Sequence, residues 1–595
     1  MISRPDGQNE GNSADNAEPV IRVEDLRKSF DRDGDQVVAL DGVNFHALPG
    51  QVTGLVGPDA AGKTTLLRIL AGLISPDDGR VEVLGLDAAE RPRDVQASVA
   101  YMPQTFGLYQ ELTVQQNLDL WADLHGVGRS DRQDRYEKLM EMAGLDEFRQ
   151  RLAGDLSGGM KQKLGLSCSL VRTPSLLLLD EPTVGVDPLS RRQLWSIIYQ
   201  LVEDEQITVV LSTAYLDEAQ RCNEVAVIHE GRLLGQDAPQ TFIQAVQNRC
   251  WSVTPGQLDR RRAQQELSQR DEVLDAVLRA DQIHLLLTED AHADPGDWLD
   301  DDQARAEQAE PIFEDAFIDM LQSGSDRQEV ETIPVQIDRS DQDEPVIEVE
   351  QLRRAFGDFY AVDGLSFQVR RGEIFGLLGA NGAGKSTTFR MLCGLLSPTD
   401  GRVEVVGHDL RQAPAEARAR IGYMSQSFSL YQTLSPAQNL RFFGGAYGLT
   451  GRSGRRRIEK VAASLQLGDF IDSPSGSLPL GYKQRLAMAA AMLHEPEILF
   501  LDEPTSGVDP LARREFWAQI IHQSLAGVTV MITTHFMVEA EYCDRLAIMS
   551  AGKILTIGTP AEIRNAAASE EHPEPTMEDA FIQLIQSQQD REQNE

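Results

Sequence analysis

One long segment occurs twice in this chain, and the repeat constrains the fold more than any other feature of the sequence. The stretch GLVGPDAAGKTTLLRILAGLISPDDGRVEVLGLD at 54–87 matches GLLGANGAGKSTTFRMLCGLLSPTDGRVEVVGHD at 376–409. Two later pairs, YMPQTFGLYQELTVQQNL with YMSQSFSLYQTLSPAQNL and LLLLDEPTVGVDPLSRRQLW with ILFLDEPTSGVDPLARREFW, keep the same offset of 322 residues, from 54 to 376. Chance does not hold one register across such distant segments. The 595 residues are therefore predicted to contain two copies of one domain.

The two copies end at a different offset, which reveals an insertion in the first. PIFEDAFIDMLQS at 311–323 matches PTMEDAFIQLIQS at 575–587, an offset of 264 residues, so the first copy carries about 58 more (322 − 264), roughly between 249 and 307. The insert opens with the extended stretch CWSVTP and continues with a charged, helix-like stretch and the apolar run IHLLL. We predict a disordered tail at 1–18, a first domain at 19–248, a small α/β appendage with a C-terminal helix at 249–323, a linker at 324–345, a second domain at 346–566, and a C-terminal helix and tail at 567–595.

Composition excludes several classes of protein. The formal net charge of −37 disfavours nucleic acid as a partner, because neutralising phosphates requires Lys and Arg. The sequence contains no run of 18 or more apolar residues, the length that a membrane-spanning helix needs. The N-terminal stretch lacks the apolar region of a secretory signal. Five scattered cysteines form no CxxC pair, which argues against disulfides, zinc and iron–sulfur clusters. We therefore expect a cytoplasmic protein.

Each copy contains the pattern GxxxxGK[ST] between a β-like apolar run and a helix-like run. Such a glycine-rich loop wraps its backbone amides around phosphates, and the helix that follows adds partial positive charge. The lysine is expected to reach the β- and γ-phosphates of ATP, and the Ser or Thr after it to bind Mg²⁺. The predicted nucleotide-binding residues are Gly57, Asp59, Ala60, Ala61, Gly62, Lys63, Thr64 and Thr65 in the first copy, and Gly379, Asn381, Gly382, Ala383, Gly384, Lys385, Ser386 and Thr387 in the second.

Each copy also has a run of four apolar residues that ends in an Asp-Glu pair. An aspartate at the end of a buried strand is well placed to bind the Mg²⁺ of a P-loop site, and the glutamate after it can polarise the attacking water as a general base. The predicted metal-binding residues are thus Asp180 and Asp502, together with Thr64 and Ser386. Glu181 and Glu503 are the predicted catalytic bases.

The order of these motifs resembles the ABC-type ATPases over about 220 residues in each half. The resemblance rests on the P-loop, a Gln after an aromatic strand end, LSGGM before KQ, LLLLDEPT and a downstream D-loop. It implies an α/β fold with two P-loop NTPase domains in tandem, each with a RecA-like mixed sheet plus helical and antiparallel β subdomains. It also implies ATP and Mg²⁺ as cofactors.

The resemblance assigns further residues to the sites. Phe30 and Phe356 match the aromatic residue on which adenine stacks. Gln104 and Gln426 match the glutamine that contacts Mg²⁺ and senses the transporter, and Asp187 and Asp509 match the D-loop aspartate. His535 matches the switch histidine that contacts the γ-phosphate.

In this family the two domains pair head to tail, so that each ATP lies between the P-loop of one and the LSGGQ-type motif of the other. Ser157, Gly158 and Gly159 form that motif in the first half, whereas the second half has Pro479–Leu480, which offers neither the hydroxyl nor the open backbone.

The first half has departures of its own. With a shift of one residue, Ala214 stands where the second half has His535, and Asp59 and Ala60 replace the asparagine and glycine of the second P-loop. We hypothesise one hydrolytic site and one impaired, ATP-holding site. The alternative, that both sites hydrolyse ATP, stays open because Glu181 is retained.

More narrowly, the tandem halves, the EDAFI tails and the appendage are similar to the ATP-binding subunits of ABC-2 type exporters. This implies an ATPase that drives efflux of drugs or other small solutes, lies peripherally on the cytoplasmic face of the inner membrane and works with two separate ABC-2 permease subunits. The permease is expected to dock just after Gln104 and Gln426. Two alternatives stay open: a tandem translation factor that binds the ribosome, and a tandem importer ATPase for sugars.

Overall fold

The computed structural model describes residues 18–32, 35–105, 107–291, 294–322, 344–569, 573 and 575–594. The chain forms two compact units. Unit 1 contains Met1–Gln247 and Pro311–Gly324, and unit 2 contains Asn248–Glu310 and Ser325–Glu595. The predicted tail at 1–18 and linker at 324–345 lie outside the described residues, apart from residues 18, 344 and 345.

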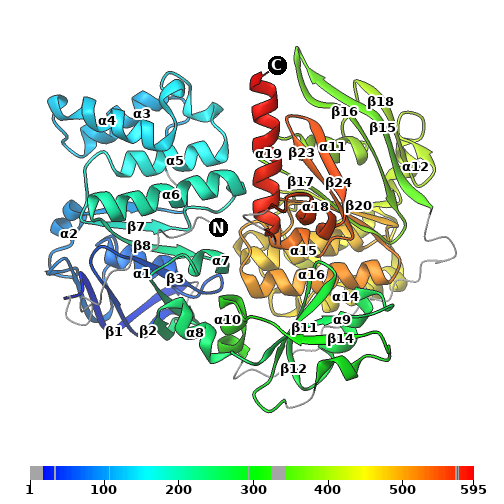
Figure 1. Ribbon diagram of the computed structural model, residues 1–595, viewed down its shortest axis with the longest axis horizontal. Coiled ribbons are helices and arrows are strands. Elements are labelled where there is room, and N and C mark those ends of the chain that lie inside the picture. The colour runs from blue at the N-terminus through cyan, green and yellow to red at the C-terminus, as the bar shows by residue number, and fades with distance from the viewer. Residues whose placement is uncertain are drawn as a thin grey trace. The chain divides into compact units, whose positions relative to one another are not determined.

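The centre of unit 1 is a six-stranded sheet in the order β10-β9-β3-β8-β7-β6 (Figure 1). Neighbouring strands pair in parallel, except for the antiparallel pair β9 and β10. β3, β7 and β8 are buried along their whole length, as apolar strands covered on both faces are. The loops after these three strands meet at one edge of the sheet. The strands are β3 (Val52–Val56), β6 (Val99–Met102), β7 (Leu176–Asp180), β8 (Thr208–Thr213), β9 (Glu224–His229) and β10 (Arg232–Asp237).

A second, antiparallel sheet of unit 1 has the order β2-β1-β4-β5, with β1 (Ile21–Arg32), β2 (Asp35–Ala47), β4 (Asp78–Val83) and β5 (Leu86–Asp87). Helices α3 and α4 both contact α5, the hydroxyl of Tyr136 on α4 donates to the carbonyl oxygen of Leu118 on α3, and the three helices form the helical part. The final helix α10 returns to pack on α7 and α8. The helices are α1 (Lys63–Leu70), α2 (Pro92–Ser98), α3 (Val114–Leu124), α4 (Arg129–Ala143), α5 (Gly158–Ser169), α6 (Pro188–Glu205), α7 (Leu216–Ala219), α8 (Pro239–Ala245) and α10 (Phe313–Gln322).

Unit 2 contains the second copy of this arrangement. Its six-stranded sheet has the order β20-β21-β22-β17-β23-β24, and its antiparallel sheet the order β16-β15-β18-β19. The first sheet contains β17 (Ile374–Gly379), β20 (Ile421–Met424), β21 (Ile498–Asp502), β22 (Thr529–Thr534), β23 (Arg545–Ser550) and β24 (Lys553–Gly558). The second contains β15 (Pro345–Phe356), β16 (Phe359–Arg370), β18 (Asp400–Val405) and β19 (His408–Asp409).

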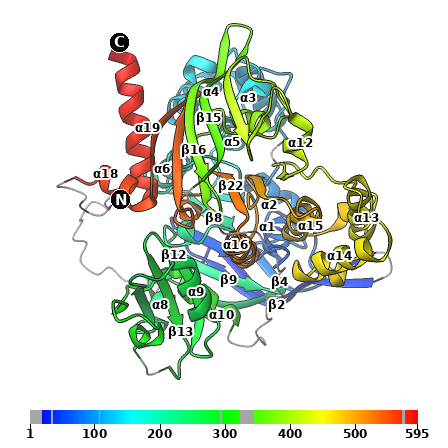
Figure 2. The ribbon, with the colours of Figure 1, turned by 90° about the vertical axis from the view of Figure 1, so that its right-hand side faces the viewer.

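The helices of unit 2 repeat those of unit 1. Figure 2 shows α13 and α14 beside α15, and the three helices contact one another as α3, α4 and α5 do. The last helix, α19, packs on α17 and α18. The helices are α11 (Lys385–Leu392), α12 (Pro414–Arg418), α13 (Pro436–Ala446), α14 (Gly451–Ser464), α15 (Leu480–Met492), α16 (Pro510–Leu525), α17 (Met537–Ala540), α18 (Pro560–Ala566) and α19 (Met577–Asn594). The predicted fold class is confirmed, with a mixed sheet, an antiparallel sheet and a helical part in each half.

The inserted segment forms a four-stranded antiparallel sheet in the order β12-β13-β11-β14, covered by α9 (Arg260–Ser268). Its strands are β11 (Cys250–Thr254), β12 (Val273–Arg279), β13 (Gln282–Leu287) and β14 (Arg305–Gln308). Although it follows the first domain in sequence, its apolar residues share one core with the second domain, including Leu267 with Trp517 and Tyr542. The contacts therefore divide the predicted 249–323 appendage: its sheet belongs to unit 2, and its C-terminal helix α10 belongs to unit 1.

Charged contacts attach this sheet and α9 to the second domain. Arg514 on α16 forms an ion pair with Asp275 on β12, and both side chains are largely buried. Arg261 on α9 donates to Asp544 Oδ2 over 3.1 Å, and Arg260 donates to the carbonyl oxygen of Glu541 over 3.2 Å. These pairs explain why the insert lies on a domain that follows it in the chain.

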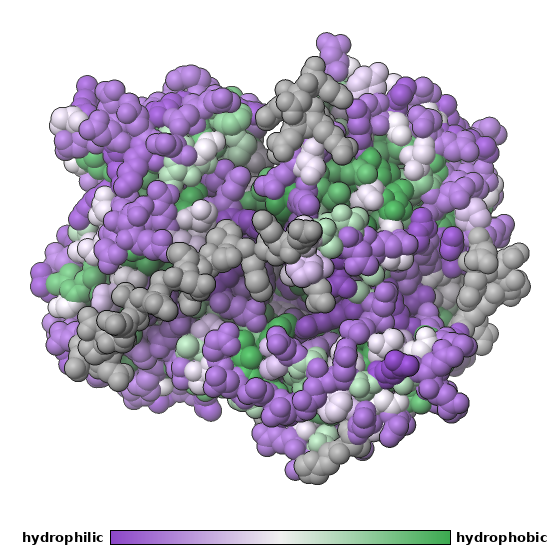
Figure 3. All heavy atoms as spheres, viewed as in Figure 1, coloured by the Kyte–Doolittle hydropathy of each residue, from purple (hydrophilic) through white to green (hydrophobic). Residues whose placement is uncertain are grey.

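The face drawn in Figure 3 is mainly hydrophilic, in keeping with the net charge of −37. All five cysteines are free and buried, as expected from their scattered spacing. Among the helices that the structure describes, none combines the length and the apolar character needed to cross a membrane.

Candidate nucleotide-binding sites

The P-loop of unit 2 lies between the end of β17 and the start of α11. Gly384 precedes the helix with φ of 101°, a left-handed conformation that favours glycine. Lys385 Nζ donates to the carbonyl oxygens of Gly379 over 2.7 Å and Ala380 over 3.2 Å, so the lysine lies over its own loop. Ser386 Oγ donates to Asp502 Oδ1 over 3.2 Å. The residues predicted from the motif therefore come together at the carboxyl edge of the sheet.

Glu503 follows Asp502 at the end of β21, and its side chain is only 6% exposed. Its Oε1 lies 3.7 Å from Lys385 Nζ, and its Oε2 accepts a hydrogen bond from Gln426 Nε2 over 2.8 Å. His535 Nδ1 lies 3.3 Å from the same Oε2. Burial alone would raise the pKa of Glu503, but the contacts with His535, Lys385 and Gln426 outweigh it and lower the pKa. The carboxylate is thus held in its charged form, as a general base requires.

Unit 1 repeats this geometry around its own P-loop. Lys63 Nζ donates to the carbonyl oxygen of Gly57 over 2.6 Å, and Thr64 Oγ1 donates to Asp180 Oδ1 over 3.0 Å. Glu181 Oε1 lies 3.7 Å from Lys63 Nζ, the same separation as in unit 2. Gln104 Nε2 donates to Glu181 Oε2 over 2.6 Å. The two units therefore share every one of these contacts.

The difference between the units is the group beside the glutamate. In unit 1 the backbone N–H of Tyr215 donates to Thr213 Oγ1 over 2.9 Å, and in unit 2 Phe536 donates to Thr534 Oγ1 over the same distance. This match places the buried Ala214 at the position of His535. Without the imidazole, burial dominates, and the pKa of Glu181 is raised above its ordinary value.

The first P-loop also has a strained backbone position. Ala60 has φ of 62°, where its counterpart Gly382 has φ of 84°. A Cβ built on Gly382 would meet nothing within 4 Å, so the alanine costs conformational energy rather than space. A left-handed conformation of an L-residue costs about 1 kcal/mol.

The two LSGGQ-type segments differ at their helix starts. Ser157 precedes α5, and its hydroxyl accepts a hydrogen bond from the backbone N–H of Met160 over 3.3 Å. A Cβ on Gly159 would lie 2.4 Å from Ser190, so the glycine is required for packing against α6. Pro479 precedes α15 without a side-chain cap, yet α15 forms from Leu480 onward. Within the described part of unit 1, no hydrogen bond joins Ser157, Gly158 or Gly159 to the P-loop.

The two predicted adenine-stacking residues lie at strand ends and are exposed. Phe30 on β1 is 43% exposed and Phe356 on β15 is 50% exposed. Each has a cation beside its ring, at 5.4 Å for Lys28 and 4.6 Å for Arg354. Asp187 and Asp509, the D-loop aspartates, cap α6 and α16.

Sequence reasoning missed the residues that hold the aspartates in place. Ser212 Oγ donates to Asp180 Oδ1 over 2.7 Å, and Thr533 Oγ1 donates to Asp502 Oδ1 over 2.6 Å. The hydroxyl of Tyr101 donates to Asp180 Oδ2 over 3.2 Å. Ser212 and Thr533 could have been found from the sequence, because each is a polar residue at the end of an apolar strand, in VVLST and MITT.

Four of the six residues predicted to contact Mg²⁺ fit that ion, two in each unit. Each site offers one hydroxyl and one aspartate oxygen, from Thr64 and Asp180 or from Ser386 and Asp502, and Mg²⁺ prefers such hard oxygen ligands. The amide nitrogens of Gln104 and Gln426 contact the glutamates instead. Bound there, the ion would neutralise phosphate charge.

Comparisons with known proteins agree with these P-loop ATPase sites. The sequence profile of the family described as "ABC transporter" matches residues 40–184 and 362–506. "Probable multidrug ABC transporter ATP-binding protein YbhF" of Escherichia coli (strain K12) is 47% identical over 577 residues, which cover 97% of this chain and 99% of that protein. The chain therefore belongs to the ABC transporter family. It is an ATP-binding subunit, and the predicted enzyme class, an ATPase coupled to transmembrane transport, is confirmed.

Shorter relatives match one half of the chain. "Nod factor export ATP-binding protein I" of Ralstonia nicotianae (strain ATCC BAA-1114 / GMI1000) is 39% identical over 220 residues, covering 37% of this chain and 68% of that protein. "Linearmycin resistance ATP-binding protein LnrL" of Bacillus subtilis (strain 168) is 38% identical over 223 residues, covering 37% of this chain and 70% of that protein.

Proposed function

We propose that this chain is the motor of an exporter for drugs or other small solutes, and that it works with two separate ABC-2 type permease subunits. Its place is peripheral, on the cytoplasmic face of the inner membrane, with no nucleic acid partner. The names of the relatives that match one half, with Nod factor export and linearmycin resistance, support export rather than import. The relative that matches almost the whole chain is described as a probable multidrug transporter protein.

An exposed aromatic cluster in unit 2 supports the docking of a permease. Tyr431, Phe442 and Phe443 contact one another through their rings, and the first two are 49% and 51% exposed. The cluster follows Gln426 in the chain, and the amide of Gln426 donates to Glu503. A permease bound at the cluster would therefore be connected to the predicted general base through Gln426. Exposed aromatic clusters of this kind are typical of protein interfaces.

The proposed catalytic roles follow the geometry of unit 2. Glu503 acts as the general base that polarises the attacking water, and His535 lies beside it to contact the γ-phosphate. Lys385 leaves its carbonyl partners to bind the β- and γ-phosphates, and Ser386 and Asp502 hold the Mg²⁺.

We further propose that the two units pair head to tail and form one hydrolytic and one impaired, ATP-holding site. The P-loop of unit 2 then works with Ser157–Gly159, and the P-loop of unit 1 with Pro479–Leu480. A single observation supports the asymmetry best: His535 lies 3.3 Å from Glu503, whereas Ala214 occupies its position near Glu181. The missing histidine, replaced by Ala214, and the altered LSGGQ-type segment, Pro479–Leu480, then belong to the same ATP site.

Two isosteric variants test the proposal in the complex purified with its membrane subunits. Glu503→Gln is expected to lower the ATPase rate about 100-fold or more, because it removes the general base. Glu181→Gln is expected to leave the rate within about twofold, since the impaired site contributes little to turnover. Each variant is the matched control of the other. Equal losses would contradict the asymmetry, and failure to purify with any membrane subunit would contradict the exporter assignment.

A further inference from the structure

Unit 2 contains a cavity of about 510 Å³ between α9 and the second ATPase domain. This volume falls in the range of small-molecule sites, about 300–1,000 Å³. Five arginines and three acidic residues line the cavity, which leaves an excess of positive charge: Arg261, Arg262, Arg370, Arg371 and Arg545, with Asp259, Glu373 and Asp544. In a chain with a net charge of −37, such a concentration of positive charge requires an explanation.

Three of the arginines are already paired with acids. Arg261 donates to Asp544 over 3.1 Å, and Arg545 donates to Glu373 over the same distance. Arg371 donates to Glu497 over 3.2 Å. Their charges serve to hold the segments around the cavity together.

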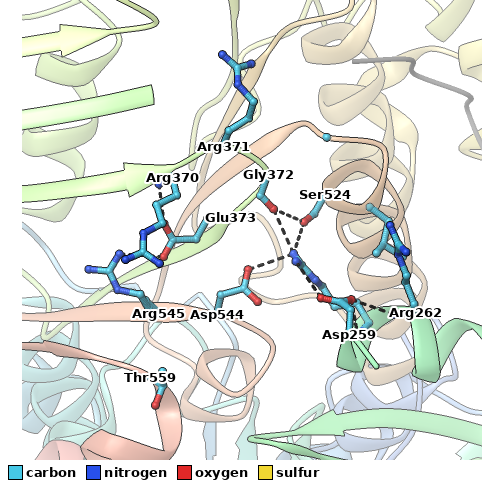
Figure 4. Close-up of a pocket in the computed structure, with 13 residues that line it drawn as sticks. Asp259, Arg262, Arg370, Arg371, Gly372, Glu373, Ser524, Asp544, Arg545 and Thr559 are labelled. Carbon is cyan, nitrogen blue, oxygen red and sulfur yellow. Dashed lines mark hydrogen bonds and ion pairs between the residues drawn. The ribbon is translucent and has the colours of Figure 1, made fainter. Parts of the chain in front are cut away.

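The charges of the other two arginines, Arg262 and Arg370, are not paired with an acidic residue in the described part of the chain. The side chains of Arg262 and Arg370 form no hydrogen bond or ion pair with any residue that the structure describes, and both are exposed. Figure 4 shows them on opposite sides of the cavity, Arg262 on α9 and Arg370 at the end of β16. Unpaired cationic side chains therefore lie both on the inserted segment and on the second ATPase domain.

The corresponding edge of unit 1 has the same framework without these cations. Val52 N donates to Asn223 Oδ1 over 2.9 Å, and Ile374 N donates to Asp544 Oδ2 over 2.8 Å, which aligns the two edges. The positions of Arg370, Arg371 and Arg545 are taken in unit 1 by Leu48, Pro49 and Glu224. The arginines therefore accompany the inserted segment and are not required by the ATPase fold.

The cavity lies at the opposite end of the central strands from the nucleotide. Gly372 and Glu373 line the cavity and lead into β17, which ends at Gly379 of the P-loop. At about 3.3 Å per residue, the six residues of this strand separate the two places by about 20 Å. The ATP site therefore does not account for the cavity.

We propose that this cavity is a second ligand site, which binds a small anion with a phosphate group and for which Arg262 and Arg370 supply the unpaired positive charge. The planar guanidinium group matches a phosphate with two parallel hydrogen bonds, and two unpaired guanidinium groups favour a multiply charged anion. Bound there, the anion strengthens the attachment of α9 at the amino ends of β17, β22 and β23.

The test measures binding of inorganic pyrophosphate to the full chain by calorimetry. The P-loops are first disabled with Lys63→Ala and Lys385→Ala, so that they do not contribute. Saturable binding is expected, and adding Arg262→Gln with Arg370→Gln should weaken it about tenfold or more, since each removes a charge-assisted hydrogen bond. The matched control is Arg93→Gln with Arg452→Gln, two exposed arginines outside the cavity, which should leave the affinity unchanged.

A parallel arm uses vesicles of phosphatidylcholine with phosphatidic acid, to distinguish a lipid headgroup from a soluble anion. Binding that depends on Arg262 and Arg370 supports the site. The probe that binds, pyrophosphate or the vesicles, shows whether the ligand is a soluble anion or a lipid headgroup. The proposal is overturned if neither probe binds, or if the control pair and the cavity pair weaken binding equally.

Discussion

The two ATPase domains place the same residues in the same geometry, yet they differ at one decisive neighbour. In both units the glutamate at the strand end lies 3.7 Å from the P-loop lysine and accepts a hydrogen bond from a glutamine. Only Glu503 has an imidazole beside it, and Ala214 takes that position near Glu181. A motif that is complete in sequence can thus differ in chemistry because of a residue that follows another strand.

Among the positions at which the two units differ, the largest expected effect comes from removing that imidazole. His535→Ala is expected to lower the ATPase rate about 100-fold, the scale of one positioned catalytic group. The measurement is the steady-state ATPase rate of the purified complex. His46→Ala, an exposed histidine outside the site, is the control and should stay within about twofold. If His535→Ala kept the full rate, the difference between the two units would have no catalytic meaning.

The next effect tests why only unit 2 carries the inserted sheet. Asp275→Asn removes the charge that pairs with the largely buried Arg514, and breaking such an ion pair costs about 3 kcal/mol. Hydrogen exchange should show lower protection in unit 2 and unchanged protection in unit 1. Asp281→Asn, an exposed residue of the same segment, is the matched control. Equal loss of protection in both units would show that the sheet is not a part of unit 2 alone.

The placement of this sheet also shows where sequence reasoning ends. The P-loops and Asp-Glu pairs were predictable because strand, loop and helix lie within a few residues and the chemistry needs fixed spacing. The docking of α9 was not, because Arg261 reaches Asp544, 283 residues further along the chain. The insert was located by counting offsets, but its partner domain depends on tertiary contacts that leave no local pattern.

The position of Ala214 was predictable only through the repeat. Its match to His535 required a shift of one residue, and the hydrogen bonds that Thr213 and Thr534 accept from the backbone N–H two residues later support that register. Ser212 and Thr533, which hold the two aspartates, carry no motif of their own. Repeats therefore identify what differs between two sites more readily than what supports them.

A smaller effect is expected from repairing the second LSGGQ-type segment. Pro479→Ser with Leu480→Gly restores a helix cap and the space for a phosphate, and the regained phosphate contact contributes about 1 kcal/mol to ATP binding. If the units pair head to tail, ATP retention at the P-loop of unit 1 should rise about fivefold, measured by equilibrium binding in a Glu503→Gln background. Pro474→Ser, which lies before a separate short turn, is the control. Unchanged retention would count against the proposed pairing.

The smallest effect concerns the strained loop position, where the two units offer opposite substitutions. Ala60→Gly relieves a left-handed alanine and should raise the melting temperature of unit 1 by about 2–4 °C. Gly382→Ala introduces the same strain without a clash and should lower that of unit 2 by a similar amount. Differential scanning calorimetry of the full chain measures both. Opposite shifts of the two melting temperatures would show that backbone strain distinguishes the two loops. If the melting temperature of Ala60→Gly did not change, Asp59 would remain as the residue that distinguishes the first P-loop.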